Sequence, residues 1–129
     1  MASSTAPEDQ RLIHGTTWNV LQQTTWWRTG NPDASDWVER TSMRLAHKFH
    51  VLGWLEDRAT TILQEHARHL TIEARTSLFE DDLQSEADYF FELSDQYSTA
   101  ALAVRSTPLY KRLVFDIVDR VGTGEAKRI

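Results

Sequence analysis

The stretch WVERTSMRLAHKFHVLGWLEDRATTILQEHARHL, residues 37–70, decides the fold class. Its mostly apolar stripe has steps of three and four residues, at positions 37, 41, 45, 49, 52, 55, 59, 62, 66 and 70. This spacing places the stripe on one side of an α-helix. A second row, at positions 43, 47, 51 and 54, follows the first half, so we expect that half to pack on two sides. The stretch predicts a long central helix.

Proline and glycine, which turns and hairpins normally need, are nearly absent from the middle of the chain. Between Pro32 and Pro108 only Gly53 interrupts this pattern. Capping boxes, Thr5 with Glu8 and Ser77 with Glu80, precede two further apolar stripes. We therefore predict an all-α, four-helix bundle-like domain with two long helices and no strand. The expected helices cover residues 6–27, 37–70, 79–104 and 108–121.

Length and composition bound the class of protein. The chain has 129 residues, enough for a single domain over 1–129, with flexible ends at 1–5 and 123–129. It has no cysteine, which excludes a disulfide scaffold and thiolate chemistry. No apolar run is long enough to cross a bilayer, and no signal peptide is visible. We expect a soluble, cytoplasmic protein without membrane contact.

The formal net charge is −5, and the acids are segregated. Residues 76–104 contain seven acids and no Lys or Arg. This pattern indicates either a solvated acidic face or a docking surface for a basic protein, through Asp81, Asp82 and Glu86. Nucleic-acid binding is disfavoured, because no basic stripe with stacking aromatic residues occurs.

Histidine spacing offers one metal-site hypothesis. Glu65, His66, His69 and Glu73 share a helix face closely enough to chelate a metal. Di-iron bundles, however, need Glu-x-x-His motifs, and this sequence has none. We therefore expect these histidines to lie at the surface or its boundary, and we expect no cofactor and no catalytic group.

Tryptophan is over-represented, with five residues in the chain. A small helical core accommodates two or three of them, and tryptophan is enriched at interface hot spots. Trp26, Trp27 and Trp37 flank the loop that Gly30, Asn31 and Pro32 indicate. The sequence therefore predicts a partner interface at these three tryptophans.

Three short segments carry a family resemblance. They are Asp36–Arg40 opening a charged helix, Phe79–Asp82 opening an acidic one, and Thr107–Leu109 opening the last. In this order they resemble the small helical gamma subunit of soluble di-iron methane and short-chain hydrocarbon monooxygenase hydroxylases. The resemblance implies a non-catalytic subunit that packs against the large subunit housing the iron centre, and it transfers no functional residue.

The leading hypothesis is a non-catalytic helical accessory subunit or adaptor of a larger protein assembly. Two alternatives stay open: an acidic regulator or inhibitor of a basic partner, and a bundle that binds metal through its histidine and glutamate side chains.

Overall fold

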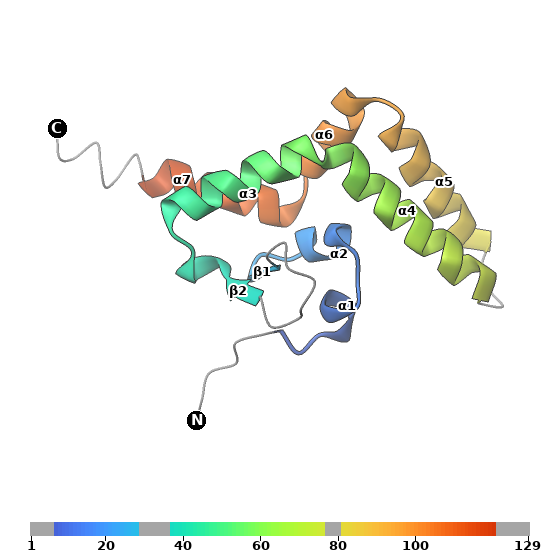
Figure 1. Ribbon diagram of the computed structural model, residues 1–129, viewed down its shortest axis with the longest axis horizontal. Coiled ribbons are helices and arrows are strands. Elements are labelled where there is room, and N and C mark those ends of the chain that lie inside the picture. Colours follow the sequence, from blue (N-terminus) through green and yellow to red (C-terminus); the bar gives the residue numbers. More distant parts are fainter. Residues whose placement is uncertain (1–6, 29–36, 77–80, 121–129) are drawn as a thin grey trace.

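A computed structural model describes residues 7–28, 37–76 and 81–120, and these residues are mainly helical (Figure 1). The elements in chain order are α1 (Gln10–Ile13), α2 (Thr17–Leu21), β1 (Trp26–Arg28), β2 (Trp37–Glu39), a 3₁₀ turn (Arg40–Ser42), α3 (Leu45–Asp57), α4 (Ala59–Thr76), α5 (Asp81–Ser94), α6 (Tyr97–Arg105) and α7 (Pro108–Arg120). The predicted α class is confirmed. The predicted flexible ends and the capping boxes at Thr5 and Ser77 lie outside the described residues.

Two antiparallel helix pairs organise the chain. Figure 1 shows α7 running back along α3, and α5 running back along α4 to form a hairpin that points away from the N-terminal elements. Helix α6 contacts both α3 and α4 at the corner between the two pairs. Helix α2 contacts both α4 and α7, so the N-terminal segment joins the two pairs.

The predicted central helix is present as two helices rather than one. Helix α3 begins only at Leu45, and the chain bends at Arg58 before α4 continues to Thr76. No proline or glycine stands at the bend. Instead α6 packs into the corner, where small side chains allow close approach and are buried; they are Ala59, Ala100 and Ala101. The bend therefore coincides with the packing of α6 and not with a helix-breaking residue.

The predicted third helix is also divided, at Asp95 and Gln96. Two hydroxyl side chains near the break donate hydrogen bonds to backbone carbonyls: Ser94 to Phe91 O at 2.7 Å and Thr99 to Leu93 O at 2.8 Å. Such bonds compete with the helical ladder. The last helix ends within the predicted range, and its predicted stripe of Leu109, Leu113 and Ile117 is buried.

The prediction of a helix over residues 6–27 and of no strand is wrong. The segment forms two short helices, and then β1 pairs antiparallel with β2, Trp27 lying opposite Val38. Aromatic and β-branched residues favour strands, and successive strand residues point to opposite sides. Trp27 is accordingly buried and Trp26 only half-buried.

An ion-pair network holds α7 against the 3₁₀ turn and α3. Asp116 accepts hydrogen bonds from Arg40 and, at 3.0 Å, from Lys48 Nζ. Burial alone would raise the pKa of the Asp116 carboxyl, but the hydrogen bonds from Arg40 and Lys48 outweigh it and hold the pKa below its ordinary value. The pair of helices α3 and α7 is therefore held by charge as well as by apolar contact.

Candidate functional site

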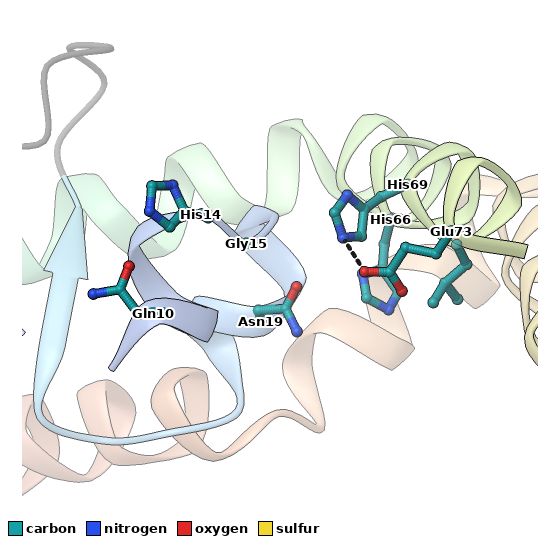
Figure 2. Close-up of a pocket in the computed structure, with 8 residues that line it drawn as sticks. Gln10, His14, Gly15, Asn19, His66, His69 and Glu73 are labelled. Atoms are coloured by element: carbon teal, nitrogen blue, oxygen red, sulfur yellow. Dashed lines mark ion pairs between the residues drawn. The ribbon is translucent and has the colours of Figure 1, made fainter. Parts of the chain in front are cut away.

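A pocket lined mostly by polar residues lies where the N-terminal segment meets α4 (Figure 2). Its volume is about 500 Å³, in the range of small-molecule sites. Three of the four side chains considered as metal ligands line it: His66, His69 and Glu73. The other lining residues are Gln10, His14, Gly15, Asn19 and Leu70.

The N-terminus of α2 forms one wall of the pocket. Thr16 caps this helix in a capping box with Asn19, whose Oδ1 accepts from Thr16 N at 3.0 Å. Thr16 Oγ1 lies 2.9 Å from the same Oδ1 and 2.8 Å from Nδ1 of His66 on α4. Thr16 and His66 are both buried, so their contact joins the two elements inside the protein, and the expectation of a surface or boundary histidine is wrong for His66.

The network assigns the protons of His66. Asn19 Oδ1 accepts a hydrogen bond from the Thr16 amide, and the same oxygen is the neighbour of the Thr16 hydroxyl, so the hydroxyl can only donate to it. A hydroxyl has one hydrogen, which must lie between the two oxygens. His66 Nδ1 therefore donates to Thr16 Oγ1. The neutral ring then carries its lone pair on Nε2.

Burial keeps this ring neutral. Desolvation, followed by repulsion from His69, lowers the pKa of His66 from 6.5 to about 4. Aromatic rings surround it: Phe90 meets it edge-on with centroids 4.7 Å apart, and Trp18 lies at 6.2 Å. His66 therefore acts at neutral pH as an uncharged hydrogen-bond donor to α2.

The other three metal-ligand candidates, Glu65, His69 and Glu73, each have a contact within the chain. Glu65 Oε1 accepts from the Thr17 amide at 3.0 Å and so helps to cap α2. His69 Nε2 and Glu73 Oε1 pair with each other at 3.1 Å, as the dashed line in Figure 2 marks. Within residues 7–28, 37–76 and 81–120, no group of three or more His, Asp or Glu side chains could hold a metal ion.

Two of the three predicted interface tryptophans lie inside the chain. Trp27 and Trp37 are each 6% exposed and belong to the core. Trp27 meets Trp54 edge-on at 5.7 Å, and the Arg28 guanidinium lies 5.5 Å from the Trp37 ring. Among Trp26, Trp27 and Trp37, only Trp26 has a side chain that is half-buried and so partly accessible to a partner.

The acidic helix borders a second hollow. Asp82 and Glu86 are exposed on α5, while the side chain of Asp81 lies outside the described residues. Between α2, α5 and α6 runs a mainly apolar groove of about 450 Å³. We call it the α5–α6 groove; its lining residues are Trp18, Gln22, Tyr89, Phe90, Leu93, Thr99, Leu102, Ala103, Ser106 and Thr107.

Sequence reasoning missed this groove, because α2, which is distant in the chain from α5 and α6, supplies one of its walls. One signal was available. Tyr89 and Leu102 are large apolar residues that lie off the predicted stripe of their helices, and they are 58% and 63% exposed. Side chains of this kind, placed side by side by the fold, form the accessible part of the groove.

Comparisons with protein-family models, with curated proteins and with solved structures found no match to this chain. Among the described helices, none is both long and apolar enough to cross a membrane.

Proposed function

We propose that this protein is a non-catalytic helical accessory subunit or adaptor, which binds a protein partner through the α5–α6 groove and the acidic face of α5. The observation that carries the proposal is the groove itself. Large exposed apolar side chains, Tyr89 and Leu102, flank an apolar hollow on a helical scaffold. Apolar surface of this kind is typical of a contact with another molecule.

The floor of the groove is firmly packed. Trp18 and Phe90 meet edge-on with ring centroids 5.1 Å apart, and Tyr89 stacks edge-on against Phe90 at 5.7 Å. Rigid aromatic walls lose little conformational entropy when a partner binds. They are the type of surface into which a partner inserts an apolar anchor.

Charge indicates the chemistry of the partner. Glu86 and Asp82 precede Tyr89 by three and seven residues, so they continue the same side of α5 beyond the groove. Both are exposed. A partner helix with apolar anchors flanked by Lys or Arg matches this surface, in the helix-in-groove mode of recognition.

The non-catalytic part of the proposal is supported by the polar pocket. Three of its ionisable side chains hold contacts within the chain: His66 with Thr16, and His69 with Glu73. A narrower form of the proposal rests only on the sequence resemblance. In that form the partner is the large hydroxylase subunit of a soluble di-iron monooxygenase.

An inhibitor that sequesters a basic protein would use the same face. The observation that favours this second function is the set of exposed acids on α5, which has no basic residue; they are Asp82, Glu86, Asp88 and Glu92. Its binding would weaken steeply as salt rises, whereas binding that depends mainly on an apolar anchor in the groove would weaken less, because only the flanking charge contacts are screened.

Recovery of the tagged full chain from its native cells tests the proposal. One partner should co-purify in stoichiometric amount, Leu102→Glu should abolish its recovery, and Glu86→Lys should weaken it. Ile72→Glu is the matched control, because Ile72 is 61% exposed on α4 and does not line the groove. A chain recovered alone, or a partner indifferent to Leu102→Glu, contradicts the proposal.

A further inference from the structure

Helix α7 carries a second apolar stripe in addition to the one that faces the core. Leu109, Leu113 and Ile117 are buried. Val114, Phe115 and Val118 lie on other sides of the helix and are 37%, 53% and 63% exposed. We call these three residues the outer face of α7. An apolar row at steps of one, three and four residues is typical of a helix that buries that side too.

Basic side chains border this outer face. Lys111 and Arg112 are exposed, and the Arg112 guanidinium lies 4.7 Å from the Phe115 ring centroid. Asp116 pairs with Arg40, with Lys48 and, at 3.6 Å, with Nε of Arg112 on the same helix, so three cations share its single negative charge. Asp119 is the remaining acid of the helix. The outer face is therefore an apolar row with a net basic border.

The α5–α6 groove has the complementary chemistry. It is an apolar hollow whose α5 wall continues into Asp82 and Glu86. We propose that α7 of a second copy of this chain occupies the groove, with Phe115 and Val118 against Tyr89 and Leu102, and with Lys111 and Arg112 toward the acids of α5. This inference rests on the proposed function, since it identifies the partner helix for the same groove.

The geometry makes the contact heterologous, because the outer face of α7 and the groove are different surfaces. Such contacts extend into open chains, or close when two copies can exchange them reciprocally. In either case a variant that lacks one surface still offers the other. Two different defective variants should therefore complement each other.

Light scattering of the purified full chain, up to about 1 mM where weak specific pairs still form, gives the first measurement. The wild type should gain mass with concentration. Leu102→Glu, which blocks the groove, and Val118→Glu, which blocks the outer face, should each stay monomeric. Ile72→Glu should assemble as the wild type does. An equimolar mixture of the two defective variants should form a one-to-one dimer.

A charge exchange provides an independent check. Glu86→Lys and Lys111→Glu should each weaken association about tenfold, and the double variant should recover most of it, because the exchanged charges again attract. Circular dichroism verifies that each variant folds. Failure of the double variant to recover association would overturn the assigned pairing of the two surfaces.

The outcomes separate this inference from the proposed function. A wild type that stays monomeric, but loses a cellular partner with Leu102→Glu, overturns the second copy as occupant and leaves the groove to that partner. A wild type that stays monomeric and has no partner sensitive to Leu102→Glu overturns both. Association that persists in Val118→Glu but not in Leu102→Glu also overturns α7 as the occupant.

Discussion

Thr16 Oγ1 lies 2.8 Å from Nδ1 of His66, and this buried contact joins residues that are 50 positions apart in the chain. On one side the threonine caps α2, and on the other the histidine belongs to the core face of α4. The pair therefore fixes the N-terminal segment against α4, the helix that packs along α5.

Replacing Thr16 with valine should lower the free energy of unfolding by about 2 kcal/mol, because the change removes an N-cap and leaves a buried imidazole N–H without its acceptor. Urea denaturation at pH 7 measures the effect. Thr61→Val is the matched control: Thr61 is exposed on α4, so its loss should be within about 0.5 kcal/mol. Equal losses in the two variants would show that the contact contributes nothing.

Acid should destabilise the fold through His66. Its pKa is about 4 in the folded chain and about 6.5 when unfolded, so the unfolded chain binds more protons between these values. The free energy of unfolding should therefore fall as the pH decreases from about 6.5 to 4, by roughly 3 kcal/mol in total.

The variant His66→Asn isolates this effect, because asparagine retains a donor and does not titrate. It should be less stable than the wild type at pH 7.5 and should lose less stability between pH 7.5 and 4.5. Urea midpoints at several pH values measure both slopes. His14→Asn, at an exposed position, should keep the wild-type slope; a wild-type slope in His66→Asn would refute the assignment.

The amphipathic faces were predictable from sequence where one helix turns one side to the core. Leu109, Leu113 and Ile117 are an example, since their spacing alone places them together. The bend at Arg58 was not predictable, because no proline or glycine marks it and it lies where α6, a later part of the chain, packs. Strands of three residues such as β1 are too short for an alternating pattern to appear.

The candidate site, too, has features that local sequence spacing predicts and features that only tertiary packing produces. The position of His66 on the core stripe of α4 follows from periodicity, and it is buried. Its neutral state depends on Thr16 and Phe90, which approach only through tertiary packing. The tryptophans were predicted as interface residues from their number, but pairing of β1 with β2 places Trp27 and Trp37 in the core.

Loss of the Asp116 carboxylate should weaken the attachment of α7 to the 3₁₀ turn and α3. Asp116→Asn leaves Arg40 and Lys48, whose side chains are 13% and 14% exposed, without a counter-charge. Uncompensated charge in partly buried positions is costly, so we expect a loss of about 2 kcal/mol or more in chemical denaturation at pH 7.

Glu92→Gln, an exposed carboxylate on α5, is the control and should change stability by less than about 0.5 kcal/mol. Because the pKa of Asp116 is lowered by its partners, its contribution is present above the ordinary Asp value and is lost as the pH falls below it. The difference between wild type and Asp116→Asn should therefore shrink in strong acid. A difference that is constant with pH would contradict an electrostatic origin.

Gly53 is a position where a simple substitution should stabilise the chain. It lies inside α3, is exposed, and an added Cβ would meet no atom within 4 Å. Glycine in a helix interior costs about 0.5–1 kcal/mol relative to alanine, through the larger backbone entropy of the unfolded chain. Gly53→Ala should therefore raise the free energy of unfolding by about that amount, which thermal and urea denaturation both measure. Gly53→Val should gain less, because a β-branched side chain is restricted in a helix. A loss of stability in the alanine variant would mean that another part of the molecule approaches this face of α3.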